Sequence, residues 1–145
     1  MKEVGGTLDV GQWELHPWLQ RDDIVSWCYE RGVVVEAYCP LVRAQRSGEE
    51  VLKKLADKYG KTWAQVLVRW SLQKVSSCFT VWVSGKMKCF TDFRQGFVPL
   101  PKSITPARIE ENAQVYDFEL SEEDMKSLET GEYSPCSWDP TTSND

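Results

Sequence analysis

A run of apolar residues at positions 33–38 is the feature that most restricts what this chain can fold into. It reads Val-Val-Val-Glu-Ala-Tyr, it follows Gly32, and Pro40 ends it. Consecutive β-branched residues bounded by glycine and proline are typical of a strand in a parallel sheet that is covered on both faces. We therefore expect a buried strand here, and helices packed around it.

Helical patterns lie on both sides of this strand. Asp22 and Asp23 begin a pattern that places Ile24, Trp27 and Cys28 on one face. Further helices are expected over residues 49–59, ended by Gly60, and from Thr62 to about 74, where Thr62 and Gln65 have the spacing of a capping box. Thr105 is the expected N-cap of a helix from Pro106, a last helix is expected from Glu122, and a short strand over 97–100. Strands alternating with helices indicate an α/β protein with parallel strands, although three strands are few for a covered sheet.

Composition excludes some broad functions. Lys and Arg total 17 against 22 acids, which gives a net charge of −5 and argues against a general nucleic-acid coat. No apolar run is long enough to span a membrane, and the first residues lack the apolar core of a signal peptide, so we expect a cytoplasmic protein with no membrane partner.

The spacing of the cysteines argues against a structural zinc site. There are five, no two form a Cys-x-x-Cys pair, and His16 is the single histidine. Structural zinc normally takes several Cys or His ligands at short spacing. Free, partly buried thiols are the better interpretation.

Residues 101–112 carry the most informative chemistry. They follow the short strand at 97–100 and enter a helix, whose first N–H groups favour an anion. Lys102 adds a positive charge, Ser103 and Thr105 add hydroxyls, and Arg108 can bind phosphate oxygens in a fork. From these residues alone, phosphate binding and a plainly capped helix both stay open.

The same stretch, Pro-Lys-Ser-x-Thr-Pro-x-Arg-Ile-x-Glu-Asn, resembles the NADP-binding signature of the aldo-keto reductases. Other pieces agree in order and spacing: residues 12–17 resemble the family's sixth strand, 33–41 its seventh strand, 62–70 its Thr-Pro-Ala-Gln-Val helix, and 115–121 the step before its last helix. The resemblance covers roughly 12–74 and 96–140. Trp18 and the segments at 131–133 and 138–140 resemble those of fungal members.

This resemblance implies a fold that the chain contains only in part. The family is a (β/α)8 TIM barrel of about 250 residues. The chain would supply strands six to eight with their helices, so residues 1–145 would form an incomplete, C-terminal and NADP-binding part of the barrel.

The resemblance also implies roles for ten residues. Lys102, Ser103, Thr105 and Arg108 would hold the 2′-phosphate of NADP(H), with Ile104 contributing backbone, and Glu111 and Asn112 would hold the adenine; Tyr38 would stack on the nicotinamide, Gln12 would hold its carboxamide, and Leu41 would lie along the pyrophosphate. Gln12 departs from the pattern because Gly11 precedes it where the family has asparagine. For Tyr38 an ordinary aromatic at a strand end stays the alternative.

The family's reaction is reduction of an aldehyde or ketone by NADPH, with a small carbonyl compound as substrate. Its tyrosine acid and the lysine, aspartate and histidine that assist it belong to early strands without counterparts here. His16 resembles a structural His-Pro of the family, and the acids at 22–23 and 122–123 are charges at helix starts. We expect this chain alone to be inactive; the alternatives are a non-enzymatic nucleotide- or protein-binding module derived from a half barrel, or an α/β domain whose motifs have lost function.

Residues 75–95 interrupt the resemblance as an atypical insertion. In the family the pieces at 69–74 and 96–103 run on directly, whereas 21 residues without a clear period separate them here. Val75-Ser76 and Gln95 fit the translation of splice-site sequences, so we interpret the insertion as a translated intron, with a real surface loop as the alternative. Either way it should be poorly packed and leave Lys102 and Arg108 at the helix start.

Overall fold

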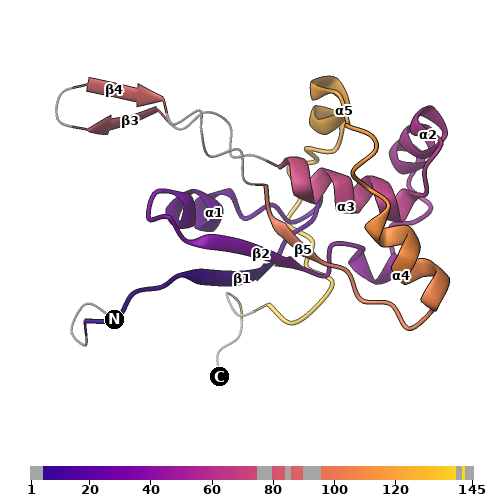
Figure 1. Cartoon of the computed structure of the whole chain (residues 1–145), viewed down its shortest axis with the longest axis horizontal. Coiled ribbons are helices and arrows are strands. Elements are labelled where there is room, and N and C mark those ends of the chain that lie inside the picture. The colour runs from indigo at the N-terminus through magenta and orange to yellow at the C-terminus, as the bar shows by residue number, and fades with distance from the viewer. Residues whose placement is uncertain (1–4, 75–79, 84–85, 90–95, 140–141, 143–145) are drawn as a thin grey trace.

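A three-stranded parallel sheet lies at the centre of the molecule (Figure 1). The computed structural model describes residues 5–74, 80–83, 86–89, 96–139 and 142. The strands are β1 (Val10–Glu14), β2 (Val34–Tyr38) and β5 (Val98–Leu100), in the order β1-β2-β5. The α/β class and the parallel strands expected from the sequence are therefore confirmed.

The central strand is buried on one face only, so the expectation of a strand covered on both faces is wrong. Val35 and Ala37 are buried in the core, whereas Val34 is 39% exposed. Val10, Val98 and Leu100 are exposed as well, and the register pairs Val10 with Val34. The reason is that the helices of the described residues pack their apolar side chains against the Val35 side of β2, in one core cluster.

The helices begin close to where the sequence places them. They are α1 (Asp22–Tyr29), α2 (Glu50–Tyr59), α3 (Trp63–Gln73), α4 (Pro106–Ala113) and α5 (Glu122–Ser127), with a short 3-10 turn at Val42–Ala44. Gly60 ends α2 at φ 61, a left-handed conformation that suits glycine. Thr62 and Gln65 form the expected capping box of α3.

The predicted inner face of α1 is wrong in part. Val25 and Cys28 are buried, but Trp27 is 46% exposed and Ile24 is only partly buried. The guanidinium of Arg31 lies 4.3 Å from the centre of the Trp27 ring. That cation–π contact gives the exposed indole a partner on the surface and removes the need to bury it.

Gln65 fixes the position of α4 on α3. Its side-chain amide donates to the backbone carbonyls of Glu111 (3.1 Å) and Gln114 (3.0 Å) at the end of α4. The same side chain accepts a hydrogen bond from the Thr62 backbone N–H in the capping box. One buried amide therefore links the start of α3 to the end of α4 and helps to position α4.

Part of the insertion forms a hairpin that the sequence did not predict. Strands β3 (Thr80–Val83) and β4 (Lys86–Cys89) pair antiparallel as a separate sheet, with Val83 opposite Lys86. Figure 1 shows this hairpin away from the central sheet. The β-branched residues of 80–83 explain the strand, and the expectation that the rest of 75–95 is poorly packed lies outside the described residues.

The segment after α5 has the irregular backbone expected of it, yet it packs closely on the body. Tyr133 forms an isolated bridge with Leu19, and the backbone N–H of Ser134 donates to the carbonyl of Trp18 at 2.9 Å. Arg21 and Asp139 form an ion pair at 3.1 Å, with both side chains buried. Separately, no helix within the described ranges has the length and apolar character needed to cross a bilayer.

Candidate cofactor-binding site

The motif residues at 101–112 lie where β5 ends and α4 begins (Figure 1). The register pairs Tyr38, the last residue of β2, with Leu100, the last residue of β5. The loop that carries Lys102 therefore leaves the sheet beside Tyr38. Carboxyl ends of parallel strands are where α/β proteins usually bind ligands.

The first turn of α4 has features that favour an anion. Thr105 stands at the predicted N-cap position and Pro106 at the first helical position, but the Thr105 side chain does not cap the helix. Instead, the Ser103 hydroxyl accepts a hydrogen bond from the Thr105 backbone N–H at 3.2 Å. The first turn contains no acid, unlike those of α1, α2 and α5, so the positive end of α4 is not neutralised locally.

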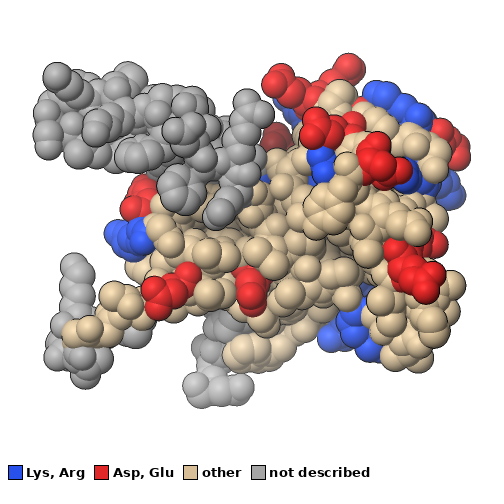
Figure 2. Space-filling model, in the orientation of Figure 1, with Lys and Arg blue, Asp and Glu red and all other residues tan. Residues whose placement is uncertain are grey.

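Lys102 and Arg108 add positive charge at this helix start. Both residues are exposed, and within the described part of the chain neither forms an ion pair or a side-chain hydrogen bond. On the face shown in Figure 2, acidic and basic side chains are interspersed and form no broad basic surface. The two cations therefore suit a small anion better than a nucleic acid.

Asn112 provides a buried polar atom that lacks a partner. The residue is 8% exposed, and its side-chain oxygen Oδ1 accepts no hydrogen bond within the described structure. Asn112 lines a shallow pocket of about 180 Å³ together with Pro101, Ile109 and Ala113. Burying a polar group without a hydrogen-bond partner costs free energy. Binding of a ligand that donates a hydrogen bond to Asn112 Oδ1 would therefore be favoured here.

Glu111, the other residue assigned to the adenine, is already engaged. Its carboxylate accepts a hydrogen bond from the Thr62 hydroxyl at 2.7 Å, which links α4 to the start of α3. The sequence did not predict this contact, since 49 positions separate the two residues. In the described structure Glu111 therefore positions α4.

The three remaining predicted residues lie on or after β1 and β2. Gln12 is exposed and donates from Nε2 to the Glu36 carboxylate at 2.9 Å, across the paired strands. Tyr38 is half-buried, and burial first, then the charge of Glu14, raises the pKa of its phenol. Leu41 is also half-buried and precedes the 3-10 turn at 42–44.

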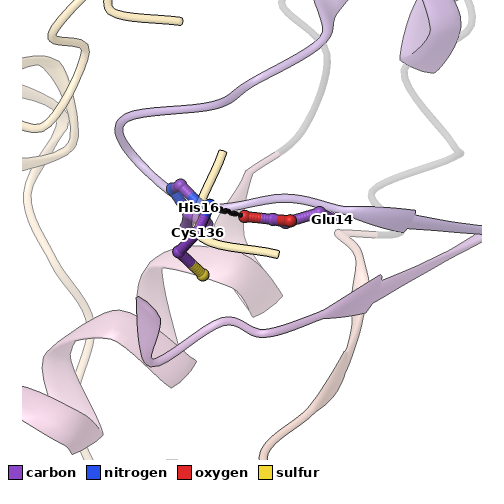
Figure 3. A group of neighbouring side chains, drawn as sticks. All are labelled: Glu14, His16 and Cys136. Carbon is purple, nitrogen blue, oxygen red and sulfur yellow. Dashed lines mark hydrogen bonds and ion pairs between the residues drawn. The ribbon is translucent and has the colours of Figure 1, made fainter. Parts of the chain in front are cut away.

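A cluster of three side chains lies at the end of β1, where Glu14 pairs with Tyr38: the buried Glu14 and His16, and the partly buried Cys136 (Figure 3). The His16 Nε2 atom lies 3.0 Å from Glu14 Oε1. The Glu14 carboxylate also accepts the backbone N–H groups of Cys136 (2.6 Å, at Oε1) and Ser137 (3.1 Å, at Oε2). Glu14 thus anchors a segment that is 122 residues away in sequence.

The protonation of this cluster follows from its burial. Burial alone would raise the pKa of Glu14, but the hydrogen bonds from Cys136 and His16 outweigh it and lower that pKa. Burial lowers the pKa of His16 despite the nearby carboxylate, so a neutral imidazole donates from Nε2 to the Glu14 anion. Both residues are buried from solvent, which agrees with the expectation that His16 is structural. Side chains of this kind can ligate metals, but both Glu14 oxygens already accept backbone donors, so the arrangement suits an anchor.

Comparison with known proteins finds consistent relatives. The model of the "Aldo/keto reductase family" matches residues 7–131. An uncharacterised oxidoreductase of Schizosaccharomyces pombe is 37% identical over 133 residues, covering 88% of this chain and 41% of the relative. Glyoxal reductase of Bacillus subtilis is 38% identical over 120 residues, covering 83% of this chain and 36% of the relative. The chain thus spans about two fifths of the length of such curated relatives.

Solved structures agree with the fold. A mutant of Gox0644 in complex with NADPH has a TM-score of 0.79 at 28% identity and covers 100% of this chain and 46% of that one. An aldo-keto reductase from a deep-sea metagenome library has a TM-score of 0.73 at 31% identity, with 94% and 43% coverage. In both, the likeness extends over less than half of the solved chain.

Proposed function

The chain belongs to the aldo/keto reductase family, and we propose that it is the C-terminal, cofactor-binding part of an NADP-dependent member. The complete enzyme would reduce an aldehyde or ketone to an alcohol. Support comes from the glyoxal reductase among its relatives and from the NADPH complex among its structural neighbours.

One observation carries this proposal: two exposed cations without partners among the described residues, Lys102 and Arg108, at the start of α4. An NADP phosphate needs positive charge and hydrogen-bond donors, and a helix start supplies both. Asn112, with its unsatisfied oxygen beside the shallow pocket, offers an acceptor to the amino group of an adenine. The residues present therefore fit the adenosine 2′-phosphate end of NADP(H).

Each motif residue takes one part in this arrangement. Arg108 would bind phosphate oxygens through its guanidinium fork, and Lys102 would contribute a point charge. The Ser103 and Thr105 hydroxyls would donate to the same group, while the exposed Ile104 would contribute its backbone. For Glu111 we propose an indirect part, because its carboxylate holds α4 on Thr62.

The nicotinamide end would lie toward the end of β2. We propose that the Tyr38 ring stacks on the nicotinamide, that Gln12 binds the carboxamide after releasing Glu36, and that Leu41 contacts the pyrophosphate. Bound NADPH would supply a hydride. This chain's contribution would be to hold and orient the cofactor, while protonation of the carbonyl would need residues outside these 145.

Loss of the Arg108 side chain tests the proposal. Arg108→Ala should weaken binding of NADPH about 10- to 150-fold, because one charge-assisted contact to phosphate is worth about 1.5–3 kcal/mol. NADH lacks the 2′-phosphate, so its binding should change less than about 2-fold. The difference between the losses of affinity for NADPH and NADH should shrink as salt is raised, because the Arg108 side chain is exposed and its charge is screened. Titration calorimetry with both cofactors measures the two effects.

The matched control is Arg31→Ala, which removes an exposed arginine in the turn after α1 that contacts Trp27 and Glu30. It should leave both affinities unchanged. Adenosine 2′,5′-bisphosphate and AMP extend the comparison to ligands that need only the adenosine end. Equal losses for NADPH and NADH in Arg108→Ala would refute the phosphate assignment.

The exposed face of the sheet supports a second candidate, a binding module made from part of a barrel. Val34, Val98 and Leu100 present apolar side chains that another chain could cover. The sequence upstream at the same locus separates the two candidates. If it encodes the remaining strands in frame, the chain is part of an enzyme, whereas their absence would favour the module.

A further inference from the structure

Two of the cysteines come together although 97 positions separate them in sequence. Cys39 directly follows Tyr38, which pairs with Glu14 across β1 and β2. Cys136 donates its backbone N–H to the Glu14 carboxylate at 2.6 Å. Both cysteines therefore lie beside the same glutamate, which brings residues from distant parts of the chain to one place.

We propose that Cys39 and Cys136 are a redox-active pair, and that a low-molecular-weight disulfide such as glutathione disulfide oxidises them to a bond that locks the C-terminal segment onto the end of β2. This inference concerns the thiols alone and does not depend on the proposed function. Both cysteines are free and only partly buried, whereas Cys28 is fully buried in the core.

The segment is already placed for such a bond. Besides the amides of Cys136 and Ser137 on Glu14, the Arg21–Asp139 ion pair holds its far end, and the Ser134 N–H holds its beginning. Cross-linking would thus join two sites that are already in place.

The order of the two exchange steps follows from the surroundings of each thiol. Burial first, and then the hydrogen bond and charge of Glu14, raise the pKa of Cys136 to about 12, so its thiol is protonated at neutral pH. Exchange therefore begins at Cys39: its sulfur attacks one sulfur of the glutathione disulfide, its proton passes to solvent, and one glutathione leaves as thiolate.

The second step closes the protein disulfide. The Cys136 sulfur attacks the Cys39 sulfur of the mixed disulfide, its proton passes to solvent, and the second glutathione leaves as thiolate. In total the two cysteine sulfurs lose two electrons and two protons, and one glutathione disulfide becomes two glutathione thiols.

Peptide mapping under non-reducing conditions tests the pairing. The chain is prepared with Cys78→Ser and Cys89→Ser, so that Cys28, Cys39 and Cys136 remain, and is treated with glutathione disulfide. We expect one cross-linked peptide pair containing Cys39 and Cys136, and a fall in free thiols from three to one. Dithiothreitol should restore all three.

The same reaction in concentrated urea tests whether the fold is what brings Cys39 and Cys136 together. In an unfolded chain the shortest loop closes most readily, so Cys28 should pair with Cys39 instead. In native buffer, Cys136→Ser should leave Cys39 carrying glutathione with no internal bond. Hydrogen exchange at residues 136 and 137 should slow in the oxidised native chain.

Three results would overturn the proposal. They are glutathione on both cysteines without an internal bond, a Cys28–Cys39 bond in native buffer, and three thiols that stay free after treatment. A product that is the same in native buffer and in urea would also count against it, because the pairing would then owe nothing to the fold.

Discussion

Glu14→Gln tests the idea that one buried carboxylate holds the C-terminal segment in place. Glu14 is 1% exposed, and its two oxygens accept the N–H groups of Cys136 and Ser137 as well as the imidazole N–H of His16. Glutamine has nearly the same shape but no charge, and it replaces one acceptor oxygen with a donor. That donor would meet a backbone N–H group, which cannot accept it.

The cost can be worked out from these contacts. Loss of the charge turns two charge-assisted hydrogen bonds into neutral ones, which removes about 1 kcal/mol each. The N–H group that faces the new donor is left buried without a partner, at about 1–3 kcal/mol. The free energy of unfolding should therefore fall by about 3–5 kcal/mol, a large fraction of the 5–15 kcal/mol that is typical of a domain.

Urea unfolding of the whole chain measures this change, and hydrogen exchange locates it. The amides of residues 136 and 137 should lose protection more than those of β2. Glu119→Gln is the control, because that side chain is 80% exposed and its ion pair with Arg69 should contribute no more than about 1 kcal/mol. A loss under about 1 kcal/mol in Glu14→Gln, with protection unchanged at 136 and 137, would refute the reasoning.

Two further predictions concern the stability of the chain in acid and the steric clash that a side chain at position 96 would cause. The pKa values of His16 and Glu14 both lie below their ordinary values of 6.5 and 4.5, so the unfolded chain binds more protons; the free energy of unfolding should fall as pH drops below about 6.5, and fall further below about 4.5. Urea titrations from pH 8 to pH 4 check the sign, and a stability that rose toward pH 5 would contradict it. At Gly96 a Cβ would lie 1.8 Å from the carbonyl oxygen of Leu72, so Gly96→Ala should cost about 3 kcal/mol or more. Gly48→Ala, whose Cβ would meet nothing within 4 Å, should change stability little in the same assay, and equal effects at the two glycines would disprove the clash.

The elements with local causes could be predicted from the sequence. The capping box of Thr62 and Gln65, the glycine after α2 and the proline at the start of α4 each act within a few residues, and each lies where it was expected. The helix start that carries Lys102 and Arg108 was found for the same reason, since the motif and its capping signals are contiguous.

What the sequence could not show depends on distant partners. The anchoring of residues 136 and 137 on Glu14 joins positions more than 120 apart, and nothing near Cys136 announces it. The engagement of Glu111 by Thr62 is likewise a contact between helices. The exposure of Val34 was missed because a run of valines does not reveal how many faces of its sheet are covered.

The uncovered face of the sheet also shapes how stability responds to temperature. Val10, Val34, Val98 and Leu100 keep much of their surface in water after folding. Unfolding therefore newly hydrates less apolar surface than it would for a sheet covered on both sides, and the heat-capacity increment of unfolding shrinks in proportion. A smaller increment flattens the curve of stability against temperature. It leaves the chain with a broad, low maximum that depends chiefly on the helical side of the sheet.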